Sequence, residues 1–74
     1  MTVTVQLNDY FSRYGAQSGK VSLPDGATVA DLLSYLKVPP SEVGFVIKTG
    51  QVLKETDKLD DGDNLLILPF AMGG

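Results

Sequence analysis

The chain has few side chains that could take part in covalent chemistry. Its 74 residues include no cysteine and no histidine, which excludes thiolate nucleophiles, imidazole bases and the strongest zinc ligands. A free-standing enzyme of this size without either residue would be unusual, so we expect a protein on which other enzymes act. The reactive group that remains is the carboxylate of Gly74, which follows Gly73 at the end of the sequence.

Residues 70–74 form a predicted flexible tail that presents this carboxylate. A carboxylate is ionised at neutral pH and is a poor electrophile, so a partner enzyme must activate it, most simply as an acyl-adenylate made from ATP. Glycine has no Cβ and lets the backbone enter a narrow slot, and the extended tail would reach about 17 Å from the domain. The alternative is an ordinary disordered terminus without a function.

Composition and charge exclude several other classes of function. The formal net charge is −3, from 6 basic and 9 acidic residues, which argues against nucleic-acid binding because Lys and Arg supply most of that affinity. No apolar segment approaches the ~20 residues that span a bilayer, and the N-terminus lacks the pattern of a signal peptide. We therefore expect a cytoplasmic protein that binds neither nucleic acid nor membrane.

The first part of the chain is typical of two strands joined by a long connection. Residues 2–7 alternate polar and apolar side chains with a period of two, which favours a strand with its apolar residues facing the core. Residues 8–19 are mostly polar but include three aromatic residues. We expect a hairpin connection whose aromatic residues cover one edge of the core, with a short helical turn at 9–14 as an alternative. Residues 20–23 form the second predicted strand.

Residues 28–37 form the best-defined element, a predicted helix. Thr28 and Asp31 match a capping box at its start, and Pro39 and Pro40 prevent its continuation. Apolar residues recur at i, i+3, i+4 and i+7, which places them on one face. These residues are Val29, Leu32, Leu33 and Leu36. Because an isolated helix of this length is marginal in water, it must pack on a sheet.

The second half of the chain contains three more predicted strands. Residues 43–48 are typical of a buried strand, which turns at Thr49-Gly50 into residues 51–53, and residues 64–68 form the last strand. Leu59 is the one apolar residue of the intervening loop, and we expect it to fill a gap in the core. Strands with a single helix predict an α+β, β-grasp (ubiquitin-like) fold over residues 1–69. Its mixed sheet has four to five strands, with the first and last at the centre.

The last strand predicts a binding surface beside the tail. With Leu65 and Ile67 in the core, the period of two places the other two leucines of the strand on the opposite face. With one residue of 45–47 they would form an exposed apolar patch, of the kind that marks partner surfaces. The predicted partner-binding residues are Leu66, Leu68, Phe70, Ala71 and Met72. The alternative is that the aromatic residues of the first connection fold over this patch and bury it.

The acidic turn at residues 60–63 is not predicted to bind a metal. Its Asp-Asp-Gly-Asp sequence lacks the ligand spacing of an EF-hand, and Asp and Gly are common in tight turns without a metal. Acidic side chains near the tail would instead help the protein dock on a basic partner.

Several stretches of the chain, in this order and spacing, match one known family. They are residues 25–33, the turn Thr49-Gly50, residues 59–63, and Leu68-Pro69 followed by Gly73-Gly74. Together they cover nearly the whole chain, which resembles the MoaD/ThiS type of small sulfur-carrier protein of molybdopterin and thiamine biosynthesis. Thr49 departs from this pattern, since the family often has Asn before the hairpin glycine.

The resemblance implies a carrier that binds no cofactor of its own. An E1-like adenylating enzyme would use ATP and magnesium to adenylate the Gly74 carboxylate. A sulfur donor, either a sulfurtransferase or a cysteine desulfurase, would then convert it to a thiocarboxylate. The sulfur would pass on through the large subunit of molybdopterin synthase, into which the tail inserts, or through thiazole synthase. The long connection at 8–19 favours the molybdopterin branch, whereas the pair Phe70-Ala71 favours neither.

Two other functions remain open at the level of the sequence. A ubiquitin-like modifier would share the activation step but end in an isopeptide bond between Gly74 and a lysine of another protein. A non-reactive interaction module would need no diglycine, and its function would survive deletion of Gly73 and Gly74.

Overall fold

Five strands and one α-helix build the body of the protein in a computed structural model that describes residues 1–70. Residues 71–74, and with them the predicted flexible tail beyond Phe70, lie outside the described residues. The elements are β1 (Thr2–Leu7), the 3-10 helix η1 (Asp9–Tyr14), β2 (Gly19–Ser22), α1 (Val29–Leu36), the 3-10 helix η2 (Pro40–Glu42), β3 (Val43–Lys48), β4 (Gln51–Leu53) and β5 (Asn64–Pro69). Among residues 1–70, no helix is both long and apolar enough to cross a membrane.

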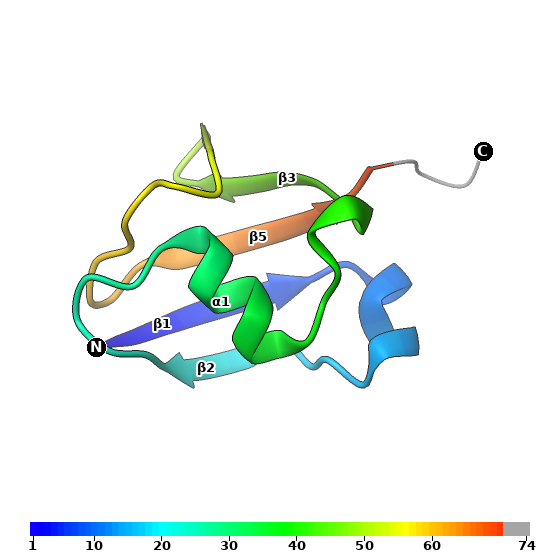
Figure 1. Cartoon of the computed structure of the whole chain (residues 1–74), viewed down its shortest axis with the longest axis horizontal. Coiled ribbons are helices and arrows are strands. Elements are labelled where there is room, and N and C mark those ends of the chain that lie inside the picture. Colours follow the sequence, from blue (N-terminus) through cyan, green and yellow to red (C-terminus); the bar gives the residue numbers. More distant parts are fainter. Residues whose placement is uncertain (71–74) are drawn as a thin grey trace.

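The strands form one mixed sheet in the order β2-β1-β5-β3-β4, with α1 lying across one face (Figure 1). The first and last strands pair in parallel at its centre, where Val5 lies beside Leu65. The other three pairings, β1–β2, β3–β4 and β3–β5, are antiparallel. This arrangement confirms the predicted α+β, ubiquitin-like β-grasp fold.

Local sequence signals fix both ends of α1. The Thr28 hydroxyl accepts a hydrogen bond from the backbone N–H of Asp31 at 3.3 Å, and the Asp31 carboxylate accepts one from the N–H of Thr28 at 2.9 Å. This is the predicted capping box. The helix ends at Leu36, because Lys37 adopts a left-handed conformation (φ 59°) as the C-cap. The predicted apolar face of the helix is fully confirmed, since its four residues are buried.

The core lies between α1 and one face of the sheet. Val3 and Val5 of β1, together with Leu65 and Ile67 of β5, point into it. Leu59 is buried there too, as predicted. The expectation for β3 was wrong in one respect: it is not a buried strand, because only its Val46 is buried.

The long first connection adds to the core from one end. Residues 9–14 form the short helix η1, which was the alternative prediction, with Asn8 as its N-cap. Phe11 is fully buried in the core, and Tyr10 and Tyr14 pack against it. The aromatic residues therefore close the end of the core, as predicted for its edge.

Candidate functional site

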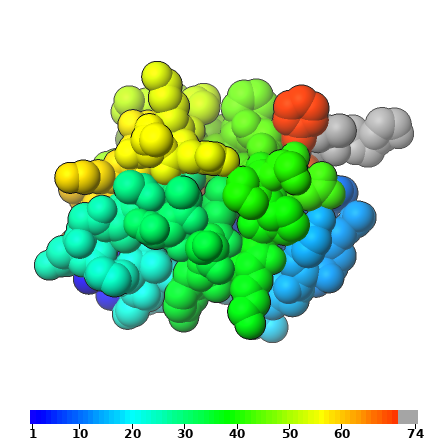
Figure 2. All heavy atoms as spheres, viewed as in Figure 1, coloured from blue at the N-terminus to red at the C-terminus, as the bar shows by residue number. Residues whose placement is uncertain are grey.

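The face of the sheet opposite α1 carries the predicted binding surface. The residues of α1 and η2 cover the face that is turned toward the viewer in Figure 2. On β5, Leu65 and Ile67 are buried on the helix side, whereas Leu66 and Leu68 are half-buried on the other side. The alternation that the sequence predicted for this strand is therefore present.

Strand pairing brings further apolar residues beside these two leucines. Phe45 lies opposite Leu68, Ile47 lies opposite Leu66, and Val52 of β4 lies opposite Ile47. Directly paired residues project on the same face of a sheet. Phe45 and Val52 have exposed fractions of 51% and 55%. We refer to these five residues, Phe45, Ile47, Val52, Leu66 and Leu68, as the open-face patch.

The first connection does not cover this patch within the described chain. Phe11 belongs to the core, and the two tyrosines of η1 pack against the same core rather than over Leu66 and Leu68. The alternative in which the aromatic residues bury the patch is therefore wrong. These aromatic residues instead close the core at the end of the sheet. The binding role of the patch stays a prediction.

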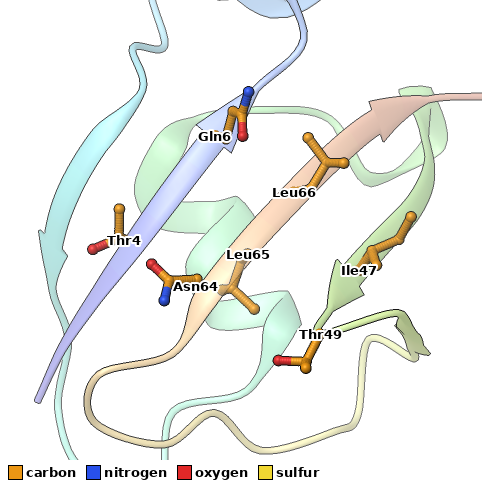
Figure 3. A pocket seen from close by; sticks show the side chains of 7 residues that line it. All are labelled: Thr4, Gln6, Ile47, Thr49, Asn64, Leu65 and Leu66. Carbon is orange, nitrogen blue, oxygen red and sulfur yellow. The ribbon is translucent and has the colours of Figure 1, made fainter.

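A shallow hollow of about 200 Å³ lies in this open face beside the patch. It is lined by Thr4, Gln6, Ile47, Thr49, Asn64, Leu65 and Leu66 (Figure 3). The labelled side chains come from β1, β5 and the end of β3, and α1 lies behind the sheet in this view. Hydroxyl and amide groups surround its apolar floor, and no lining residue is ionisable. The hollow therefore suits contact with a partner rather than acid–base chemistry.

The chain leaves the sheet through a close contact with β3. Pro69 lies opposite Val43 and is buried, and the backbone N–H of Phe70 donates to the carbonyl of Glu42 at 3.0 Å. A β-bulge between Val43 and Phe45 places Gly44 against this exit. Phe70 itself has an exposed fraction of 77%. The other predicted tail residues, Ala71, Met72, Gly73 and Gly74, lie outside the described residues.

Glu42 also binds the first connection through its side chain. Its Oε1 accepts hydrogen bonds from the hydroxyls of Tyr10 and Tyr14, each at 3.0 Å. Burial of the Tyr14 hydroxyl, followed by its hydrogen bond to Glu42, raises the pKa of Tyr14 above its ordinary value. The Arg13 guanidinium lies 4.0 Å from the centre of the Tyr10 ring, a cation–π contact. Sequence reasoning missed Glu42, since these partners are 28 and 32 residues away.

The acidic turn braces the start of β5. The Asp63 carboxylate is buried, accepts the N–H of Asp60 at 2.8 Å and lies 3.0 Å from Nζ of Lys48. Lys48 also reaches Asp60 at 3.3 Å, and the hydrogen bonds to Asp63 and Asp60 raise the pKa of Lys48. Asp61 accepts the backbone N–H of Thr2 at 2.7 Å. Across residues 1–70, no three acidic side chains are grouped as metal ligands.

Comparisons with known proteins identify one family. The model of the ThiS family matches residues 5–74. No individual curated protein sequence matches the chain significantly.

Several solved structures share the fold. A putative molybdopterin converting factor, subunit 1, from Pyrococcus furiosus superposes with a TM-score of 0.74 at 22% identity, covering 93% of this chain and 97% of its own. SAMP1 from Haloferax volcanii gives 0.70 at 19% identity, with 100% of both chains covered. The ubiquitin of Caldiarchaeum subterraneum gives 0.65 at 20% identity, covering 100% and 98%.

Proposed function

The chain belongs to the ThiS family, and from this membership we propose that it carries sulfur on the C-terminal carboxylate of Gly74. Members of this family are small sulfur-carrier proteins rather than enzymes. The match of the family model through residue 74 is the observation that carries the proposal. The lack of cysteine and histidine supports it, since the chain has no thiolate or imidazole that could do covalent chemistry in place of the carboxylate.

The chemistry begins with adenylation by an E1-like enzyme. A carboxylate oxygen of Gly74 attacks the α-phosphorus of ATP, which magnesium holds in the partner enzyme, and pyrophosphate leaves. A sulfurtransferase or a cysteine desulfurase then supplies sulfur as a cysteine persulfide, whose terminal sulfur displaces AMP and forms an acyl disulfide. A thiol of the sulfur donor or of the adenylating enzyme then attacks this bond, which releases the thiocarboxylate and leaves the two cysteine sulfurs as a disulfide. The carrier itself contributes the reacting carboxylate and Gly73, whose lack of a Cβ gives the tail access to a narrow site. Because the reaction consumes ATP, we propose that the carrier works in the cytoplasm.

The open-face patch is the proposed docking surface for the partners. Two of its residues, Leu66 and Leu68, lie on β5, the strand that leads directly into the tail, so a partner bound there would hold its active site within reach of Gly74. Exposed apolar groups of this kind commonly mark interaction sites. Phe70, Ala71 and Met72 would enter the same partner between the patch and the reacting glycine.

We favour delivery of the sulfur to molybdopterin synthase over thiazole synthase. The long connection that contains η1 supports this choice, as does the name of the Pyrococcus furiosus neighbour, a putative molybdopterin converting factor. The large synthase subunit would then be the second partner that receives the tail.

A role as a protein modifier is the second candidate. SAMP1 and the archaeal ubiquitin match this chain over its whole length, and the small archaeal modifier protein 1 of Haloferax volcanii matches 92% of it. Both functions need the same adenylated Gly74, and they differ only in the nucleophile that displaces AMP. Lysines of other proteins joined to this C-terminus in the cell would identify the modifier function.

The proposal is tested by mass spectrometry on the chain that ends at Gly74. Incubation with an adenylating enzyme from the same organism, ATP, magnesium and a sulfur source should add the mass difference between sulfur and oxygen. A chain lacking Gly73 and Gly74 is the control. It should stay unmodified yet unfold at the same temperature, since the buried core residues found within residues 1–70 run from Val3 to Ile67. An unmodified full chain with all such enzymes of the organism would exclude sulfur carriage and favour a non-reactive interaction module.

A further inference from the structure

Glu42 joins two distant segments at the point where the tail leaves the body. Its side-chain Oε1 accepts the hydroxyls of Tyr10 and Tyr14, each at 3.0 Å, while its backbone carbonyl accepts the N–H of Phe70 at 3.0 Å. One residue thus links the first connection to the last described residue of the chain. Glu42 belongs neither to the core nor to the open-face patch, so neither of these accounts for its hydrogen bonds to the tyrosines and Phe70.

The short helix that carries Glu42 is anchored at its end by β3, where Val43 pairs with Pro69, but few hydrogen bonds hold its own residues. None of the residues of η2 is buried, and its N-cap, Pro39, makes no side-chain hydrogen bond. Its own backbone bonds are short-range, from Glu42 to Pro39 and from Val43 to Pro40. The two tyrosine hydroxyls are therefore the side-chain hydrogen bonds that hold this helix on the described body.

The position of Glu42 sets where the tail begins. With the N–H of Phe70 held, four residues remain to Gly74, a reach of roughly 14 Å when extended. If the bond to Glu42 opened, the tail would begin earlier and its carboxylate would sample a wider volume. Transfer of the adenylyl group to this carboxylate requires the reacting atoms to be about 3–3.5 Å apart and aligned, so a loosely anchored tail is rarely productive.

Resting on the proposed tail chemistry, we propose that Tyr10 and Tyr14 act through Glu42 as positioning residues, fixing the point from which the tail enters its activating enzyme. This assigns a role to the 8–19 connection that goes beyond closing the core. The hydroxyls share one carboxylate oxygen, so either one alone still holds η2. Loss of both is required to release it.

The first test needs no partner enzyme. Amide hydrogen exchange is measured by NMR in the wild type and in the double variant Tyr10→Phe/Tyr14→Phe, which keeps both aromatic rings. We expect the Phe70 amide to lose roughly tenfold or more of its protection, because opening of its bond to Glu42 becomes easier. The amides of central β5, such as that of Ile67, should keep theirs. Tyr35→Phe is the matched control, since the Tyr35 side chain is 60% exposed on α1 and its hydroxyl makes no hydrogen bond within residues 1–70.

The second test measures ATP–pyrophosphate exchange catalysed by the activating enzyme with each variant as substrate. We expect kcat to fall by roughly tenfold or more in the double variant, while KM stays within about twofold because the open-face patch is unchanged. Glu42→Ala should reproduce the defect. Glu42→Gln should rescue it, since the amide oxygen still accepts hydrogen bonds from the tyrosines.

Two results of the exchange measurement would overturn the inference. One is unchanged Phe70 protection in the double variant, and the other is an equal loss of protection throughout β5, which would mean a merely structural role. A fall in kcat with Tyr35→Phe as large as in the double variant would do the same. Failure of the wild type to be adenylated would instead contradict the proposed function. The exchange measurement at Phe70 would still decide whether the two tyrosines hold the start of the tail through Glu42.

Discussion

A Cβ atom at Gly44 would lie only 2.7 Å from the carbonyl oxygen of Pro69, and 2.8 Å from Cα of Phe70. Both neighbours are backbone atoms, so they cannot rotate away as a side chain would. The bulge between Val43 and Phe45 brings the two backbones this close. Gly44 is therefore required by the path of the chain out of β5 rather than by a turn.

We expect Gly44→Ala to displace the exit of the chain. The added methyl group overlaps backbone atoms, and overpacking of this kind lowers the free energy of unfolding by about 1–3 kcal/mol. Urea denaturation measures this loss, and the exchange rate of the Phe70 amide should rise with it.

Gly15→Ala is the comparison for this substitution. Its φ of 76° makes a side chain unfavourable, but no atom lies within 4 Å of the added Cβ. It should cost about 1 kcal/mol through the backbone alone and leave the exchange of the Phe70 amide unchanged. If Gly44→Ala kept the stability and the Phe70 exchange rate of the wild type, the path of the chain out of β5 could shift without a loss of stability, and Gly44 would not be required there.

Truncation on one face of β5 should mainly lower stability, whereas truncation on the other face should mainly weaken partner binding. Ile67 is fully buried, so Ile67→Ala should lower the free energy of unfolding by about 2–5 kcal/mol. Leu66 is only half-buried on the open face, and Leu66→Ala should cost clearly less. If this face docks the activating enzyme, however, Leu66→Ala should raise KM for adenylation by roughly 5- to 10-fold.

Ser34→Ala is the control for docking, because Ser34 is an exposed residue of α1. It lies on the helix side of the sheet and should leave KM unchanged. Equal effects of Leu66→Ala and Ser34→Ala on KM would place the docking surface elsewhere.

Elements specified by short-range patterns could be predicted from the sequence. The capping box of Thr28 and Asp31 and the spacing of four apolar residues define α1 because they act within a few residues of one another. The same holds for β5, where alternation separates Leu65 from Leu66. The central position of the first and last strands followed from the run of strands around one helix, since few topologies can cover such a sheet.

Features that depend on strand pairing could not be predicted in the same way. The apolar run of β3 resembles a buried strand, yet Phe45 is exposed because α1 covers only one face of the sheet. Val52 was missed as a patch residue. The turn at Thr49-Gly50 could have revealed it, because a hairpin with this turn pairs Val52 with Ile47. The role of Glu42 depends on partners from two distant segments, for which the sequence gives no local signal.

The buried carboxylate of Asp63 should stabilise the turn before β5. It accepts the N–H of Asp60 and pairs with Lys48, and its exposed fraction is only 9%. Asp63→Ala leaves the N–H of Asp60 without its partner and Lys48 with Asp60 alone, and it should lower the free energy of unfolding by about 1–3 kcal/mol. Asp60→Asn is the control, because the Asp60 side chain is exposed and surface pairs contribute about 0–1 kcal/mol. Thermal and urea unfolding check both, and equal losses would mean that burial of Asp63 is unimportant.

Stability should decrease at alkaline pH through two groups whose pKa is raised on folding. Burial raises the pKa of Tyr14 above its ordinary 10.0, and the hydrogen bond to Asp63 raises that of Lys48 above its ordinary 10.5. Above these ordinary values the unfolded chain releases protons that the folded protein still holds. The unfolded state then binds fewer protons than the folded state, so the free energy of unfolding falls as pH rises. Both contributions are complete below the ordinary values and are lost as pH passes the raised ones.

The measurement is urea unfolding from about pH 9 to about pH 11, where this linkage acts. The wild type should lose stability progressively over this window. Tyr14→Phe removes one of the two groups, so its stability should fall less steeply, although the variant starts lower because it lacks the hydrogen bond to Glu42. A flat or rising profile in the wild type, or an identical slope in Tyr14→Phe, would contradict the role assigned to Tyr14. Exchange of the Phe70 amide over the same pH range would show whether its bond to the Glu42 carbonyl weakens when the Tyr14 hydroxyl loses its bond to the Glu42 carboxylate.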